Sequence, residues 1–342
     1  MITRLFQAKD LHDEQSYAAI ATLFHEGQVV VFPTETVYGL GACYDDENAL
    51  EKIFSVKGRP ADNPLIVHVL PDYELSRIVE FVPETAHALI RVFWPGPLTL
   101  VFKKKSSVSP LISGGLPTIA VRSPNHPIAK KLLKAVGKPL AAPSANLSGK
   151  PSSTTVDHVL EDFDGRVAAI VDGGPSALGL ESTVLDVSVT PPVILRPGSI
   201  SADSIEAVLK MPLGDTTTQA QNKPKAPGMK YRHYQPQGVV TLIKGSSSAV
   251  VHHLQTLALD EKHHNTAWIM VDEYAQTIQV PHVFSWGSLY DPATLAARLY
   301  ALLREMDHRG YGHIMMHGLL EDPLSQAVMN RLEKAATHII RL

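Results

Sequence analysis

The sequence predicts a two-domain α/β protein, and three observations support this prediction. Its 342 residues exceed the usual length of a chain built around one hydrophobic core. Short apolar runs alternate with segments of helical periodicity through most of the chain, which is typical of helices packed on a sheet. Between residues 211 and 237 this pattern stops, and the proline-, threonine- and glutamine-rich composition is typical of a linker.

The first domain is expected to begin with a helix over residues 15–27, because Tyr17, Ile20 and Phe24 fall on one helical face. The apolar run 29–32 predicts a short buried strand, and residues 34–41 predict a polar turn. Further helices are expected at 46–56, 84–93 and 126–135. Further strands are expected at 65–69, 98–102, 118–122, 167–171, 183–187 and 193–196. Several of these strands follow one another without a helix, so we expect a mixed sheet.

The alternation resumes after the linker and predicts a smaller α/β domain with parallel strands in three layers. Strands are expected at 239–243, 267–271 and 313–316, and helices at 248–258, 292–308 and 323–337. The predicted domains are residues 1–205 and 238–342, joined by a linker over 206–237.

Composition narrows the class of protein. The net charge of −3 is unlike that of a general polyanion binder, which needs an excess of Lys and Arg. The single cysteine, Cys43, allows no disulfide within the chain and fits a reducing compartment. No signal-peptide pattern and no apolar run near the ~18 residues of a membrane span occurs, so we expect a cytoplasmic protein. The sixteen histidines show no metal-binding spacing, and we expect no metal site in the protein.

Two early segments carry residues suited to anion binding. Hydroxyls and glycines at 33–41 follow a buried strand, where glycines let backbone N–H groups approach an anion, although a capped turn would explain them too. Lys57 and Arg59 flank a glycine on what we expect to be an exposed loop, a pattern that suits phosphate oxygens or an ordinary solvated turn. Asn63 follows, and His68 lies in an apolar strand, where a satisfied core histidine is the alternative.

Later segments add donors and cations at strand ends. Arg122 ends an apolar strand and needs a partner, which is either a substrate carboxylate or a structural salt bridge. Small polar residues at 143–149, and then Ser152, suit ligand binding or local capping. Ser182 opens one strand and Arg196 closes another. The segment 226–234, basic and aromatic within the linker, could fold over an anionic ligand as a lid, or be an ordinary solvated linker.

Taken together, these segments resemble the Sua5/YrdC family. The stretches FPTETVYGLG, KGRPADNPL, TIAVRSP, APSANLSG, EST, LRPG and APGMKYRHYQP carry the resemblance, in one order over about residues 13–237. It implies a YrdC-like twisted mixed sheet with helices, followed by a smaller Rossmann-like C-terminal Sua5 domain. The chain lacks a P-loop, a nucleophile elbow and a Cys-x-x-Cys pair. No motif therefore supports a classical NTPase, a serine hydrolase or a zinc-finger protein.

The resemblance implies an enzyme that makes L-threonylcarbamoyladenylate from L-threonine, bicarbonate and ATP, with pyrophosphate as the second product. This nucleotidyltransferase would use Mg²⁺ with ATP, and its product would pass to the complex that makes N6-threonylcarbamoyladenosine (t6A) in tRNA. By the family's pattern, threonine contacts Thr36, His68, Arg122 and Ser182. The implied ATP-binding residues are Arg59, Asn63, Thr118, Ser144, Asn146, Ser152, Arg196 and Tyr234. Lys57 and Arg59 are the implied catalytic cations.

Two alternatives remain at this point. One is a non-enzymatic RNA-binding protein with a concave basic face, against which the net charge of −3 argues. The other is a related carbamoyl-adenylate former of hydrogenase maturation, whose zinc-binding cysteine pairs a one-cysteine chain cannot supply. The sequence supports direct tRNA contact only weakly.

Overall fold

The computed structural model describes residues 2–342 except 12, 216–232, 259–264, 278 and 319–322. The chain divides into two compact units, Met1–Ser148 with Ser152–Tyr231 and Gly149–Pro151 with Arg232–Leu342. The predicted end of the first domain at residue 205 falls inside helix α7 (Ala202–Leu209), which packs against α3 (Glu84–Phe93) of the first unit. Across the described ranges, no helix combines the length and apolar character needed to cross a membrane.

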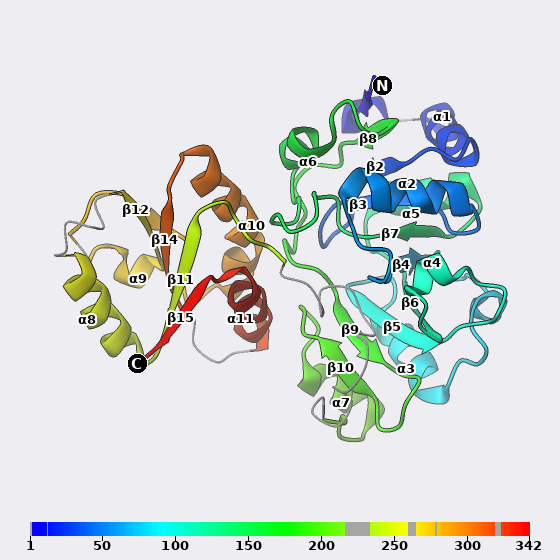
Figure 1. Ribbon diagram of the computed structural model, residues 1–342. Helices are drawn as coiled ribbons and strands as arrows, with labels where there is room; N and C mark the ends of the chain where they lie inside the picture. The colour runs from blue at the N-terminus through cyan, green and yellow to red at the C-terminus, as the bar shows by residue number, and fades with distance from the viewer. Residues whose placement is uncertain (1, 12, 216–232, 259–264, 278, 319–322) are drawn as a thin grey trace. The chain divides into compact units, whose positions relative to one another are not determined.

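The first unit is built on a mixed sheet, as the sequence predicts. Its strand order is β1-β8-β2-β3-β7-β4-β6-β5-β9-β10, with parallel and antiparallel neighbours (Figure 1). The strands are β1 (Arg4–Phe6), β2 (Val30–Phe32), β3 (Gly39–Cys43), β4 (Ile66–His68), β5 (Leu98–Lys103), β6 (Thr118–Arg122), β7 (Leu140–Ala142), β8 (Ala169–Val171), β9 (Thr183–Asp186) and β10 (Val193–Arg196).

The helices of this unit begin and end where local side chains dictate. Besides α3 and α7 they are α1 (Glu14–His25), α2 (Glu47–Lys57), α4 (Pro110–Ser113), α5 (Pro127–Val136) and α6 (Val156–Phe163). Helix α2 begins after Asp46, whose carboxylate accepts a hydrogen bond of 3.0 Å from the backbone N–H of Ala49. It ends at Gly58, whose φ of 65° is open to glycine at little cost. Lys57 and Arg59 therefore flank the C-terminal cap of α2.

The two faces of this sheet are covered differently, and the difference positions the site. One face packs against α2, α3, α4, α6 and α7 in a large core. On the other face, α1 and α5 cover β2, β3, β7 and β8. On that second face, the described residues of the apolar cluster over β4, β6, β5, β9 and β10 all belong to strands. They are Ile66, Val101, Ala120 and Val184, with the half-buried Leu195. We call this region the open half of the sheet.

One prediction about the segment 33–41 is wrong. The polar turn is shorter than expected, because residues 39–43 form strand β3 between β2 and β7. A Cβ on Gly41 would lie 2.6 Å from Cε1 of Phe32, and one on Gly39 would lie 3.1 Å from its Cζ. These glycines therefore let β3 pack closely against the Phe32 ring, and anion binding by their backbone stays a prediction.

The second unit has a parallel sheet, which confirms the prediction. Its order is β13-β12-β14-β11-β15, and all four neighbouring pairs are parallel. The strands are β11 (Val239–Lys244), β12 (Thr266–Met270), β13 (Val283–Ser285), β14 (His313–His317) and β15 (His338–Arg341). Helices α8 (Ser247–Ala258) and α9 (Asp272–Ala275) lie on one side, and α10 (Pro292–His308) and α11 (Pro323–Ala335) on the other (Figure 1).

Candidate functional site

Polar side chains gather on the open half of the first sheet. His68 at the end of β4 and Arg122 at the end of β6 are paired in register. Because side chains alternate along a strand, both lie on the same face as Ile66 and Ala120. These charged and polar groups therefore border the small apolar floor formed by the strands.

Arg122 is held by three contacts although it is only 3% exposed. Its Nε donates to the backbone oxygen of Gly96 at 3.2 Å, and its Nη1 donates to the hydroxyl of Thr36 at 2.7 Å. Its Nη2 lies 2.7 Å from Oε1 of Glu35. Of the two partners that the sequence left open for Arg122, the structure thus shows the salt bridge. Nη1 and Nη2 each keep a further N–H that could bind a ligand carboxylate.

Glu35 is the main residue of this group that the sequence did not assign. It is 8% exposed and lies within the segment 33–41. Burial raises the pKa of Glu35. The positive charge of Arg122, with hydrogen bonds from Arg122 and from the backbone N–H groups of Asn125 and Glu35, outweighs burial, so the pKa falls below its ordinary value. Glu35 is therefore ionised at neutral pH. Because Arg122 ends a strand, the sequence indicated that it needs a partner such as a carboxylate. The sequence did not indicate which of its many carboxylates is that partner.

His68 completes this group. Its ring lies edge-on to Phe32, and its Nδ1 lies 3.1 Å from the backbone oxygen of Ile66, so Nδ1 donates. Burial, assisted by the charge of Arg122, lowers the pKa of His68 to about 3. The ring is therefore neutral at neutral pH and offers hydrogen bonds rather than charge.

Ser182 joins this region to a second cation. Its hydroxyl lies 2.7 Å from that of Thr99, in the strand next to Arg122. Arg196, 3% exposed, donates from Nε and Nη2 to the backbone oxygen of Ser182 at 3.2 and 3.0 Å. The predicted threonine residue Ser182 and the predicted ATP residue Arg196 therefore touch.

Lys57 lies elsewhere than the predicted exposed loop, and that expectation is wrong. The side chain is 2% exposed, because the end of α2 meets the loop that follows β7. Its Nζ donates to the backbone oxygen of Ser144 at 2.7 Å, to the backbone oxygen of Asn146, and to Oδ1 of Asn146 at 3.1 Å. Three acceptors match the three N–H groups of an ammonium. Lys57 therefore holds this loop in place.

Arg59 is also buried rather than exposed, at 8%. Its Nε donates to the backbone oxygen of Asn63 at 3.1 Å, and its Nη2 donates to that of Pro64 at 2.8 Å. These bonds fold the loop between α2 and β4 around the guanidinium and bring Arg59 and Asn63 together. Their assignment to ATP stays a prediction.

Thr118 and Ser152 differ in how their hydroxyls are satisfied. Thr118 begins β6 and is 6% exposed, and within the described part of the chain its hydroxyl has no hydrogen-bond partner. A buried hydroxyl without a partner is costly, so it is a natural contact for a ligand. Ser152 is fully buried and donates to Oε1 of Glu181 at 2.6 Å.

Tyr234 and the predicted lid do not belong to the described part of the first unit. Tyr234 belongs to the second unit, where its ring stacks on that of Tyr300 with centroids 5.2 Å apart. Its assignment to the ATP site therefore stays a prediction. Of the segment 226–234, residues 226–232 lie outside the described residues, so the lid stays a prediction as well.

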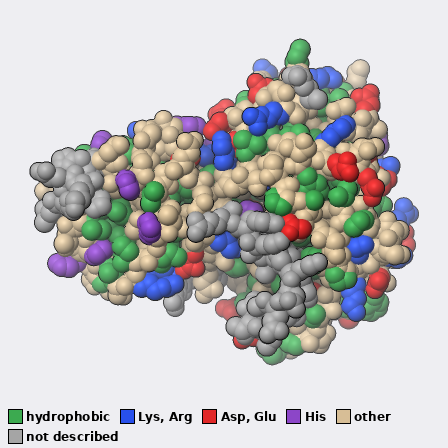
Figure 2. All heavy atoms as spheres, viewed as in Figure 1, with side chains coloured by type: hydrophobic (Ala, Val, Ile, Leu, Met, Phe, Trp, Pro, Cys, Tyr) green, Lys and Arg blue, Asp and Glu red, His purple; other side chains and the backbone are tan. Residues whose placement is uncertain are grey.

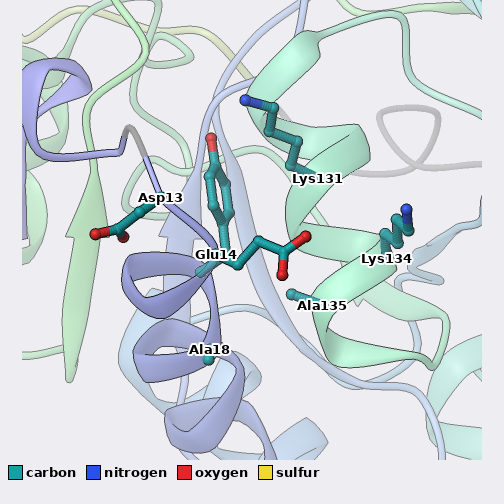
Figure 3. A pocket seen from close by; sticks show the side chains of 7 residues that line it. Asp13, Glu14, Ala18, Lys131, Lys134 and Ala135 are labelled. Atoms are coloured by element: carbon teal, nitrogen blue, oxygen red, sulfur yellow. The ribbon is translucent and has the colours of Figure 1, made fainter.

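A separate hollow lies between α1 and α5 (Figure 3). It has a volume of about 520 Å³, and Glu14, Lys131 and Lys134 bring both signs of charge to it. None of the predicted site residues lines it. Since its charges are mixed and its lysines sit on a surface helix, we place the functional site on the sheet face instead.

The described residues include no group of three or more His, Cys, Asp or Glu side chains that could hold a metal ion. Among the buried charged groups at this part of the sheet, the guanidinium groups of Arg122 and Arg196 suit anionic ligands.

Two protein families match the chain. One, named for Sua5, YciO and YrdC and described as "Telomere recombination", matches residues 22–198. The other, described as "Threonylcarbamoyl-AMP synthase, C-terminal domain", matches residues 200–337. The chain belongs to the Sua5/YrdC family. The resemblance read from the sequence is confirmed, and so is the two-part α/β fold.

Relatives of this family extend over the whole chain. A threonylcarbamoyl-AMP synthase of Pyrococcus abyssi is 42% identical over 345 residues and covers 99% of each chain. One of Bacillus subtilis is 43% identical over 334 residues and covers 96% of each chain. The crystal structure of P. abyssi Sua5 complexed with L-threonine has a TM-score of 0.91, with 41% identity and 100% of both chains covered. The likeness is therefore not confined to one unit.

Proposed function

We propose that this chain makes L-threonylcarbamoyladenylate from L-threonine, bicarbonate and ATP, releasing pyrophosphate. One observation carries the proposal most strongly. Arg122 is buried, is oriented by Gly96 and Thr36, and keeps N–H groups that can bind a carboxylate. The chain belongs to the Sua5/YrdC family, and its full-length relatives are named threonylcarbamoyl-AMP synthases. The P. abyssi Sua5 bound to L-threonine makes threonine the best-supported ligand.

The threonine subsite would consist of Thr36, His68, Arg122 and Ser182. Arg122 would bind the carboxylate of threonine, because a guanidinium matches its two oxygens. The neutral ring of His68 and the hydroxyl of Ser182 would hydrogen-bond the rest of the amino acid without adding charge.

The ATP subsite would adjoin it through the contact between Ser182 and Arg196. Arg59 and Arg196 would face the phosphates, and the hydroxyl of Thr118 would gain a partner there. We propose that Lys57 acts through the loop it holds, since its ammonium already meets Ser144 and Asn146. Mg²⁺ carried on the triphosphate would neutralise part of the charge of the departing pyrophosphate.

The chemistry needs no protein nucleophile. The amine of threonine bonds to the carbon of CO₂ and loses a proton, which gives a carbamate. When bicarbonate supplies the carbon, its C–OH bond breaks and the hydroxide leaves with that proton as water. A carbamate oxygen then bonds to the α-phosphorus of ATP as the bond from that phosphorus to pyrophosphate breaks. Negative charge grows on the phosphoryl oxygens, and cations already anchored by backbone oxygens, such as Arg196, can stabilise it without reorganising.

The product would serve tRNA modification through a separate complex that transfers the threonylcarbamoyl group, and the cytoplasmic location expected from the sequence fits that use. The RNA-binding alternative has less support. Figure 2 shows basic and acidic side chains interspersed on the visible face of the first unit, and the net charge is −3. Such a surface does not favour a nucleic-acid backbone.

Pyrophosphate release tests the proposal. We expect release from ATP and Mg²⁺ to require both threonine and bicarbonate, because the carbamate is the nucleophile. An RNA-binding protein would release none. Equal release when threonine is omitted would contradict the proposed function.

A further inference from the structure

The ion pair between Arg122 and Glu35 has an unusual position for a structural salt bridge. Its members are only 3% and 8% exposed, and they lie beside Thr36 and His68 in the proposed threonine subsite. Removing two charges from water is costly, and an apolar pair of similar size often stabilises a fold as well or better. Stability alone therefore does not account for this buried ion pair.

Both members keep hydrogen-bonding capacity that the described residues do not use. Nη1 of Arg122 donates one of its two N–H groups to Thr36. Nη2 lies close to Glu35 but makes no well-aligned hydrogen bond. The carboxylate of Glu35 lies near the backbone N–H groups of Asn125 and of Glu35 itself, but neither of its oxygens makes a well-aligned hydrogen bond. The pair thus offers spare donors on one side and spare acceptors on the other.

This pattern is complementary to an α-amino acid. Its carboxylate needs donors, its ammonium needs acceptors, and its net charge is zero. The ion pair also has no net charge, so a zwitterion adds no unbalanced charge to a desolvated site. A 2-hydroxy acid of the same shape would bring a net charge of −1 and no ammonium.

We propose that Glu35 determines specificity for the α-ammonium group of the substrate, as Arg122 does for its carboxylate. This inference rests on the proposed function and adds a residue to the same site. Glu35 would select amino acids over their hydroxy-acid analogues. Glu35 would also position the substrate nitrogen on one side of Arg122, before that nitrogen is carboxylated.

A purely structural role for Glu35 makes a different prediction. If Glu35 only orients Arg122, then its loss should weaken every ligand that has a carboxylate by the same factor. If Glu35 binds the ammonium group, its loss should weaken the binding of the amino acid selectively. It would also leave the positive charge of Arg122 unbalanced, which favours binding of the anionic hydroxy acid. The ratio of two affinities separates these roles.

The experiment compares L-threonine with 2,3-dihydroxybutyrate of matching configuration, in which a hydroxyl replaces the ammonium. Calorimetric Kd values are measured for the unsubstituted protein, for Glu35→Gln, and for Glu35→Asp, which keeps the charge at shorter reach. Glu47→Gln is the control, because Glu47 is an exposed carboxylate of α2 that accepts from Ser109. Melting temperatures check that each variant is folded.

We expect the unsubstituted protein to prefer threonine by about 10-fold or more, since hydrogen bonds to charged groups contribute that much. Glu35→Gln should lower this ratio by about 10-fold or more, through weaker threonine binding and unchanged or tighter hydroxy-acid binding. Glu35→Asp and Glu47→Gln should keep the preference.

An unchanged ratio in folded Glu35→Gln, with both ligands weakened alike, would overturn the inference. If that variant does not fold, the unsubstituted protein still decides, because equal Kd values for the two ligands would overturn it as well. A protein that binds no threonine at all would overturn the proposed function together with this inference, whereas threonine binding without discrimination would overturn the inference alone.

Discussion

His68 in the first unit and His317 in the second are buried histidines at the ends of parallel-paired strands, yet their surroundings differ. Burial lowers the pKa of His68 to about 3 and that of His317 to about 4. His68 donates to Ile66 and lies across from Arg122. His317 lies beside the ring of Tyr274, and neither of its ring nitrogens has a hydrogen-bond partner among the described residues.

Burial and a lowered pKa therefore do not identify a functional histidine by themselves. His68 is distinguished by its position among groups with unused hydrogen-bonding capacity. It lies in a part of the sheet where, within the described ranges, the apolar cluster includes no helix residue. The second unit buries its sheet on both faces under helices and leaves His317 in a mainly apolar setting.

The largest expected effect concerns Lys57, a buried cation of the first unit. Lys57→Met should reduce the unfolding free energy by about 3 kcal/mol, because it leaves buried acceptors of the 144–146 loop without a donor. Lys52→Met in the same helix, where an exposed lysine donates to Gly27, should cost less than about 1 kcal/mol. Urea unfolding measures both. An equal loss of unfolding free energy in the two variants would show that the buried contacts of Lys57 stabilise the fold no more than the exposed contact of Lys52.

A smaller effect separates the two histidines. His68→Leu should weaken threonine binding by about 10-fold, through the loss of a hydrogen bond beside Arg122. His317→Leu should leave threonine affinity unchanged and should not lower stability, because it removes buried nitrogens that have no partner. Calorimetric titration with threonine tests the pair. Loss of affinity in both variants, or in neither, would break the comparison.

A third effect appears only below neutral pH, in the pH dependence of stability. Both histidines have a folded-state pKa below the ordinary value of 6.5, so the unfolded chain binds more protons below that pH. Each histidine therefore contributes stability that is present above about pH 6.5 and is lost as the pH falls towards its folded-state pKa.

The window ends near pH 4 for His317 and near pH 3 for His68. The loss should reach a few kcal/mol at most for each ring. Either His→Leu variant should melt with a shallower dependence on pH than the unsubstituted protein between pH 6.5 and 4. Parallel melting curves for all three proteins would contradict the assigned pKa directions.

Periodic and capped segments could be predicted from the sequence. The helix at 292–308 and the strand at 118–122 lie where the pattern of apolar residues indicates. Strand β3 could not be predicted, because its Gly-Leu-Gly-Ala-Cys sequence lacks strand-forming residues and depends on packing against Phe32. The short helices α6 and α7 were also missed, although their signals are present: Val159, Leu160 and Phe163 of α6 follow the N-cap Thr155 at helical spacing, and α7 follows the N-cap Ser201.

The candidate site was predictable as a set of residues but not as a set of contacts. Arg122 showed from its position that it needed a partner, yet only the folded sheet brings Glu35 and Thr36 to it. Likewise, the burial of Lys57 depends on where the loop after β7 meets α2. Such contacts join segments far apart in the chain, and local patterns carry no information about them.

The most direct test of the account follows the carbon of bicarbonate. The protein is incubated with ATP, Mg²⁺, L-threonine and labelled bicarbonate, and the nucleotide products are separated. We predict a labelled adenylate that forms only when threonine is present. Threonine-dependent pyrophosphate release without label in any adenylate would contradict the proposed reaction, because the bicarbonate carbon must remain in the product.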